Sequence, residues 1–210
     1  MARAQLASYA PHVRRTQAPE PRSGRQATMN VHVIHFMRSI NPDTLNGLQV
    51  TALSALQRGA TEIRIHVSSD GGTTDEGFAA YHFIRSLPVP VTMHCIGNIE
   101  SMAVVLYLAG ASRLIVPHGK VKIHPMHWGF SGGPVDHDRL AEYVDSLDFD
   151  AKRYEDIFLE RTEGANEIVD VHAHLAGRAR LLDSAGAIAS GIATSISDVE
   201  IPATATRWWV

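Results

Sequence analysis

The sequence predicts an α/β domain built on a largely parallel sheet, and three observations support that class. Short runs of β-branched residues alternate with segments whose apolar residues recur at helical spacing. Gly, Pro and capping residues stand at many of the junctions. Of the 210 residues, 45% are hydrophobic and 20% charged, which is typical of a globular chain that folds without disulfides or a metal.

The expected elements follow one another from residue 31 onward. Strands are expected at 31–36, 62–67, 90–96, 113–116 and 121–124. Helices are expected from Pro42 to Gly59, at about 74–86, 101–110, 135–162 and 165–176, and from Asp183 or Ser184 to Gly191. Asn41 is the expected N-cap of the first helix, with Pro42 at its first position. Thr73 or Thr74 opens the second.

The helix expected at 135–162 carries a separate signal. Its apolar residues have the 4-3-4-3-4 spacing of an a/d seam and are Leu140, Val144, Leu147, Ala151, Tyr154 and Phe158. A seam on a helix that leaves the α/β body indicates helix packing outside that body. Packing against its own domain is the alternative, and the sequence leaves both open.

Charge and cysteine content exclude several classes of protein. The net charge of −3 gives no reason to expect a nucleic-acid partner, and a single cysteine, Cys95, excludes an intrachain disulfide and a cysteine-rich zinc site. The longest apolar run, 102–111, is about half the length of a membrane span, so no membrane association is expected. Residues 1–30 hold five Arg and one acid without the apolar core of a secretory signal. We expect a basic, disordered or cleaved leader and a cytoplasmic protein, with organelle targeting as the alternative.

Three features have the placement that catalysis requires. Gly71 and Gly72 lie between a strand and a helix, where glycine lets a backbone N–H approach a ligand, although steric needs alone also explain such a pair. Ser101 begins a helix beside unpaired N–H groups that suit an oxyanion, and a simple N-cap is the alternative. His124 ends a strand, where a histidine is often only structural.

Taken together, these segments resemble the proteolytic subunit of the Clp protease. S-S-D-G-G-T-T-D-E-G-F-A-A-Y (68–81) corresponds to that family's strand followed by S-P-G-G, and C-I-G-N-I-E-S-M-A (95–103) to its I-G-x-A-A-S-M. V-K-I-H-P (121–125) is similar to V-M-I-H-Q-P, and R-L-L-D-S-A-G-A-I-A-S-G-I (180–192) to R-F-L-S-A-x-E-A-x-x-x-G-L. The resemblance runs from about Val31 to Ile196, in the family's order and nearly at its spacing.

The resemblance implies the roles of individual residues in a Clp-type serine endopeptidase. Ser101 matches the nucleophile and His124 its general base, while the backbone N–H groups of Gly72 and Met102 match the oxyanion hole. The segment 127–130 resembles the strand that pairs with a peptide substrate by β-augmentation.

The resemblance also implies an architecture and partners. It implies a crotonase-like Clp-protease fold of repeated ββα units over 31–196, with a protruding handle helix at about 126–162 and a tail at 197–210. We expect a homo-oligomeric ring that encloses a chamber and cuts unfolded proteins or peptides. No metal or cofactor is implied, and ATP enters only through an AAA+ unfoldase as partner.

The sequence departs from the family where the third member of the catalytic triad is expected. The family has an aspartate directly before R-F-L-S-A, and this chain has Ala179 there. Asp170 and Asp183 are the nearest acids, with a solvated helix face and a helix N-cap as their ordinary roles.

Two further departures lie beside the expected site. Glu100 precedes Ser101 where the family has a small residue, and we expect it either to raise the pKa of His124 or to obstruct the acyl pocket. Asp70 replaces the proline of S-P-G-G.

These departures keep other functions open. A catalytically impaired, structural ring subunit is the main alternative to the peptidase. A crotonase-type enzyme shares the architecture but requires neither Ser101 nor His124. A serine–lysine dyad would use Lys120, Lys122 or Lys152 as its base.

Overall fold

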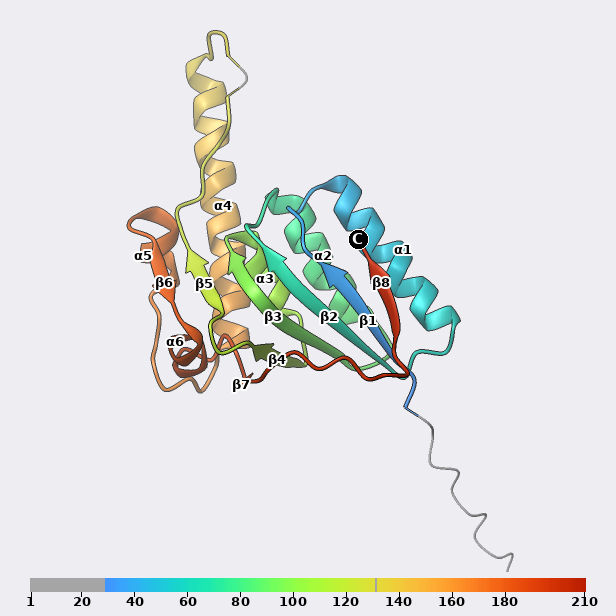
Figure 1. Cartoon of the computed structure of the whole chain (residues 1–210). Helices are drawn as coiled ribbons and strands as arrows, with labels where there is room; N and C mark the ends of the chain where they lie inside the picture. Colours follow the sequence, from blue (N-terminus) through green and yellow to red (C-terminus); the bar gives the residue numbers. More distant parts are fainter. Residues whose placement is uncertain (1–28, 131) are drawn as a thin grey trace, which may run out of the picture.

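The computed structural model describes residues 29–130 and 132–210, and these residues form an eight-stranded sheet with helices packed on it (Figure 1). Its main path runs β6-β5-β3-β2-β1-β8, with β4 and β7 beside β3. The strands are β1 (Val31–Phe36), β2 (Glu62–Ser69), β3 (Val91–Glu100), β4 (Ser112–Ile115), β5 (Lys120–Ile123), β6 (Arg180–Leu182), β7 (Ser195–Ile196) and β8 (Thr206–Trp209). Every pairing is parallel except β5 with β6, which confirms the predicted α/β class and largely parallel sheet.

Helices pack behind the sheet in Figure 1, and the long helix α4 stands out beyond it. The helices are α1 (Pro42–Gln57), α2 (Thr74–Ser86), α3 (Met102–Leu108), α4 (His137–Arg161), α5 (Val171–Ala176) and α6 (Ser184–Ala189). α3 is the most deeply placed, because all seven of its residues are buried. The buried α3 therefore packs against β3, the strand that leads into it.

The start of α1 shows how local sequence anchors a turn that matters below. Asn41 caps the helix as predicted: its side chain accepts from the Thr44 N–H at 3.0 Å, and the Thr44 hydroxyl accepts from the Asn41 N–H at 3.0 Å. The preceding residue, Ile40, forms two backbone hydrogen bonds with the turn after β2. Its N–H donates to Gly71 O, and its carbonyl accepts from the Thr73 N–H. The capped helix thereby holds that turn in place.

Several element bounds differ from the sequence prediction. β3 continues to Glu100 instead of ending near residue 96. The helix expected at 165–176 begins only at Val171, because the Asp170 side chain caps it by accepting from the Ala173 N–H at 3.0 Å. The C-terminal residues, for which no strand was expected, form β8 at the edge of the sheet beside β1.

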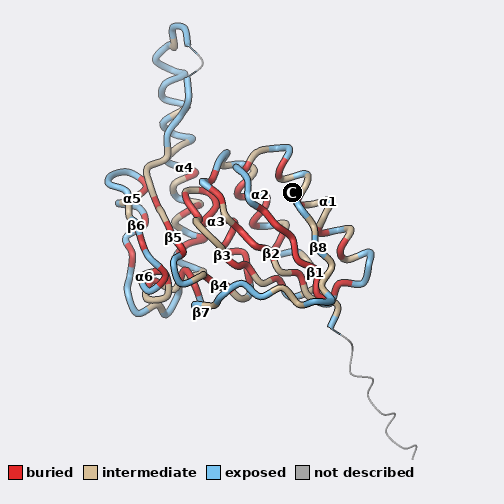
Figure 2. Tube along the Cα trace, in the orientation of Figure 1, coloured by how far each residue is buried: buried red, intermediate tan, exposed pale blue. Residues whose placement is uncertain are grey.

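The long helix α4 has two halves with different surroundings (Figure 2). Towards its C-terminus, Tyr154 and Phe158 are almost fully buried in the domain core. Towards its N-terminus, Leu140 is 44% and Val144 56% exposed, and this half extends beyond the body. The C-terminal half of the seam therefore packs against its own domain, and packing of the exposed N-terminal half against another helix stays a prediction.

Among the described residues, no helix has the length and apolar character needed to cross a membrane. The predicted basic leader lies almost wholly in residues 1–28, outside the described part of the chain.

Candidate active site

Three sequence-predicted segments meet at one edge of the sheet. β2, β3 and β5 run parallel, so the residues that follow them emerge at the same edge. These are the turn 70–72, Ser101 and His124. They line one cleft of about 780 Å³. The structure thus brings Ser101, His124 and Gly72 together, as their order along the chain predicted.

Ser101 has an unusual backbone conformation at the sharp turn between β3 and α3. Its φ of 53° makes it the only non-glycine residue with a positive φ in the described ranges 29–130 and 132–210. Such strain persists only where the surroundings enforce it, and it clusters at functional sites. Here the Ser101 N–H donates to Lys122 O at 2.9 Å, and the Tyr154 hydroxyl donates to Ser101 O at 3.4 Å. The serine side chain makes no capping hydrogen bond, so the simple N-cap interpretation does not account for it.

The glycine turn packs directly against the serine. Gly71 has a φ of 92°, and a Cβ at this position would lie 2.7 Å from the Ser101 Cβ and 3.1 Å from Met102 N. Gly72 has a φ of 155°, and a Cβ there would lie only 2.0 Å from Ile40 O. Both positions therefore require glycine. In the described part of the chain, neither the Gly72 N–H nor the Met102 N–H has a hydrogen-bond acceptor, so both donors remain free for an oxyanion.

His124 is half-buried and is oriented by its own neighbour in the chain. Its Nδ1 lies 2.9 Å from the carbonyl oxygen of Pro125. Because a carbonyl only accepts, this contact requires the proton on Nδ1 and leaves Nε2 free as an acceptor, the form that a general base needs. Among the described residues, no hydrogen bond joins the Ser101 hydroxyl to this ring. Such bonds commonly tighten only when substrate binds.

Among the described residues, no carboxylate forms a hydrogen bond or an ion pair with His124. β5 and β6 are antiparallel with Ile123 opposite Arg180, and continuing this register puts Ala179 opposite His124. Asp170 and Asp183 are both engaged at helix N-termini, accepting from the N–H groups of Ala173 and Gly186. In the described chain neither acid bonds to His124, so the expectation that one of them replaces the missing aspartate finds no support in the structure.

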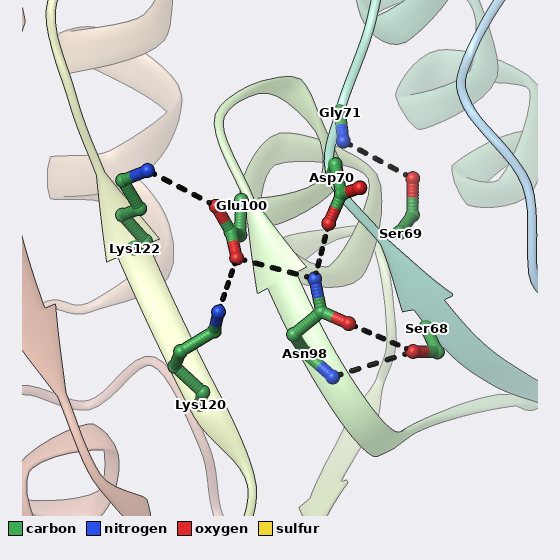
Figure 3. Close-up of polar contacts among 8 residues, drawn as sticks. All are labelled: Ser68, Ser69, Asp70, Gly71, Asn98, Glu100, Lys120 and Lys122. Carbon is green, nitrogen blue, oxygen red and sulfur yellow. Dashed lines mark hydrogen bonds and ion pairs between the residues drawn. The ribbon is translucent and has the colours of Figure 1, made fainter.

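Glu100 lies between two lysines of β5 (Figure 3). Its carboxylate is 2.6 Å from Lys120 Nζ and 3.3 Å from Lys122 Nζ. Burial alone raises the pKa of Glu100, but hydrogen bonds and attraction from both lysines outweigh burial and hold the pKa below its usual value. Glu100 is not among the described residues that line the cleft, and within the described chain it forms no hydrogen bond or ion pair with His124. The lysines hold its side chain towards β5, so the structure gives no support to the expectation that it obstructs the acyl pocket.

The lysine contacts also bear on the serine–lysine alternative. Lys120 and Lys122 pair with Glu100, and Lys152 pairs with Asp156. None of the three lines the cleft that holds Ser101. The imidazoles that line the cleft belong to His124 and His127, and His124 is the one that follows β5 beside Ser101.

The cleft is acidic and bordered by aromatic residues. Its charged lining residues are Asp70, Asp75 and Glu76, and in the part of the chain that the structure describes no Lys or Arg lines it. A cleft of this sign favours cationic over anionic peptide segments. His127 and Trp128, from the segment that resembles a substrate-pairing strand, also line it. In the described chain this segment forms no strand, and no group of three or more His, Cys, Asp or Glu side chains could hold a metal ion.

Sequence reasoning missed two groups near the site. Tyr154 was assigned to the helix seam, and its hydroxyl reaches the backbone of the candidate nucleophile. Asn98 was not considered, yet its amide donates to Asp70 at 2.6 Å and to Glu100 at 3.3 Å. The Tyr154 contact depends on how α4 packs against the body, and the Asp70 contact of Asn98 depends on how β3 lies beside the turn after β2; no local sequence pattern reveals either.

Comparisons with known proteins agree with this fold. The family model described as Clp protease matches residues 24–200. Among solved structures, a mutant of ClpP1 from Listeria monocytogenes superposes with a TM-score of 0.67. It is 18% identical in sequence, and the match covers 80% of this chain and 92% of that one. At this identity the structural likeness concerns the fold.

Proposed function

Because the chain belongs to the Clp protease family, a family of serine peptidases, we propose that it is a serine endopeptidase with Ser101 as nucleophile and His124 as general base. The observation that carries the proposal is the strained backbone of Ser101 in a cleft that also contains Gly72 and His124. The order and spacing of the family motifs support the same assignment.

The proposed reaction uses only groups of this chain and water. The Ser101 hydroxyl oxygen attacks the peptide carbonyl while its proton passes to His124 Nε2. The N–H groups of Gly72 and Met102 stabilise the tetrahedral oxyanion. His124 then protonates the departing amine as the acyl-enzyme forms. Water, deprotonated by the same imidazole, releases the acid product and restores the serine.

The orientation of His124 sets the expected rate. The Pro125 carbonyl holds the ring in the tautomer that catalysis requires. It carries no net charge, however, so it stabilises the imidazolium less than a carboxylate does. We therefore propose an active but slow peptidase.

The test is labelling with a fluorophosphonate, which modifies activated serines. The wild type should become labelled and Ser101→Ala should not. Equal labelling of both proteins would refute the assignment of the nucleophile. Labelling of neither would favour the second candidate function, an impaired structural ring subunit, which the absence of an acid opposite His124 supports.

We propose that the chain assembles into a homo-oligomeric ring and cuts peptides or unfolded proteins inside it, with an AAA+ unfoldase as partner. Family members form such rings, and the exposed half of α4 leaves Leu140 and Val144 uncovered. Leu147→Glu should lower the sedimentation coefficient at micromolar concentration and preserve the circular dichroism spectrum. Ser146→Glu adds the same charge at an adjacent exposed position and should sediment like the wild type. A wild type that stays monomeric at every concentration would refute the ring.

A further inference from the structure

A continuous chain of side-chain contacts crosses the three strands that carry the candidate site (Figure 3). It starts at Asp70, which accepts a hydrogen bond from Asn98 at 2.6 Å. Asn98 also donates to Glu100 at 3.3 Å, and Glu100 pairs with Lys120 and Lys122 on β5. The contacts thus end one residue before the Gly71–Gly72 turn, one before Ser101 and two before His124.

The backbone alone holds β3 and β5 together only weakly. The first half of β3 pairs with β4, and only Asn98, Ile99 and Glu100 pair with β5. A three-residue ladder supplies few backbone hydrogen bonds, and a slip by one residue turns every side chain to the opposite face of the sheet. Such a slip would move His124 away from Ser101. On the buried face, Ile99 opposite Val121 favours the observed register, and the polar face carries a second determinant.

The ion pairs of Glu100 have the placement to supply that second determinant. Glu100 is only 8% exposed, and a buried carboxylate without a cation is costly. In the observed register Glu100 is directly opposite Lys122, with Lys120 two residues earlier on the same face. A shift by one residue would bring Val121 or Ile123 opposite the carboxylate and remove both cations. The observed register is thereby favoured over its neighbours.

We propose that Glu100 is a positioning residue: paired with Lys120 and Lys122, it fixes β3 against β5 and so sets Ser101 relative to His124. Asn98 and Asp70 extend the same link to the glycine turn. The inference rests on the proposed function, since it assigns the distance between nucleophile and base to this contact.

The test compares Glu100→Gln with Glu62→Gln. Glu62 is a matched control, because its carboxylate also forms an ion pair within the sheet, at 2.6 Å from Arg64, and the pair lies at the opposite end of β2 from the site. Fluorophosphonate inactivation is resolved into the binding constant of the probe and its maximal rate constant. Hydrogen exchange of the Ser101 N–H, which donates to Lys122 O, reports the register without requiring activity.

In Glu100→Gln the maximal inactivation rate should fall at least about tenfold while probe binding stays within about twofold, since a small misplacement of reacting groups is costly. Exchange of the Ser101 N–H should accelerate by a similar factor. Glu62→Gln should change neither quantity. Lys120→Gln, at an exposed position, should change the inactivation rate and the exchange rate in the same directions but less. It replaces Glu100→Gln as the test if that variant does not fold.

The outcomes separate this inference from the proposed function. Faster exchange in Glu100→Gln, with no labelling of the wild type, would support the positioning role and refute the peptidase. A labelled wild type with both quantities unchanged in Glu100→Gln would overturn the positioning role and leave the peptidase intact. A change in only one of the two quantities would also overturn it, because strand register and rate would then be independent.

Discussion

The Ser101 side and the His124 side of the cleft differ in how many contacts hold the proposed catalytic group in place. On the Ser101 side, a fully buried helix follows the residue, and the backbone of Ser101 is strained. The glycine turn lies so close that a Cβ at Gly71 would be 2.7 Å from the Ser101 Cβ. On the His124 side, β5 is four residues long, and one backbone carbonyl orients the ring. The comparison indicates that the proposed nucleophile and oxyanion donors are preorganised, whereas the proposed base, among the described residues, has no hydrogen-bonded carboxylate of a full triad.

This asymmetry matters because the two sides contribute differently to the barrier. Oxyanion donors act through geometry that exists before the reaction begins. A base must also bear a positive charge in the transition state, which a neutral carbonyl supports poorly. The variants below test each side in turn.

Removal of the base should have the largest effect. His124→Ala is expected to lower turnover of a fluorogenic peptide by about 10²–10⁴-fold, the usual contribution of a general base. His118→Ala, an exposed histidine on the turn between β4 and β5, is the control and should match the wild type. If His127→Ala abolishes turnover and His124→Ala does not, the neighbouring imidazole, whose ring lies 6.3 Å away, is the base.

Distortion of the oxyanion turn should have the next largest effect. Gly72→Ala introduces a Cβ that collides with Ile40 O, which displaces the Gly72 N–H. Loss of one oxyanion donor lowers turnover by about 10²–10³-fold. Gly164→Ala is a matched control, since Gly164 also has a positive φ, of 80°, but no atoms where the Cβ would lie. Equal activity of both variants would show that Gly72 is no part of the oxyanion hole.

The smallest expected effect is on the stability of the sheet that carries both sides of the cleft. His35, His66 and His94 lie in register across β1, β2 and β3, and both ring nitrogens of His35 and of His66 are buried without a partner among the described residues. Burial, and then repulsion from His35, His94 and Arg64, lowers the pKa of His66 to about 4. The folded state therefore disfavours its protonation.

This lowered pKa predicts how stability depends on pH. The stabilisation is complete above the unfolded value near 6.5 and is lost progressively as pH falls towards 4. The melting temperature of the wild type should fall between pH 7.5 and 5, and His66→Leu should show a smaller fall. Identical falls would contradict the prediction. Rates that compare the two sides of the cleft are accordingly best measured above pH 7.

The sequence was sufficient to predict the parts of the site that follow strands. Gly72, Ser101 and His124 each stand just after a strand in a recognisable motif, and parallel strands bring such positions to one edge. The lysine partners of Glu100 depend on the register between β3 and β5, which no local pattern reveals. The positive φ of Ser101 likewise arises from tertiary packing. Asp170 did carry a local signal, an N-cap before a short helix, that the broader helical reading overlooked.

The most direct test of the account is to supply the missing acid opposite His124. We predict that Ala179→Asp raises peptide turnover at pH 7.5, by a few-fold up to the roughly 10⁴-fold that the carboxylate contributes in a serine protease. Ala179→Asn is the matched control and should give little gain, because it has a similar shape without the charge. The rise should disappear when Ser101→Ala is added. Turnover unchanged by Ala179→Asp, together with a sharp loss in Asp170→Asn or Asp183→Asn, would contradict the account, since His124 would then already have its acid.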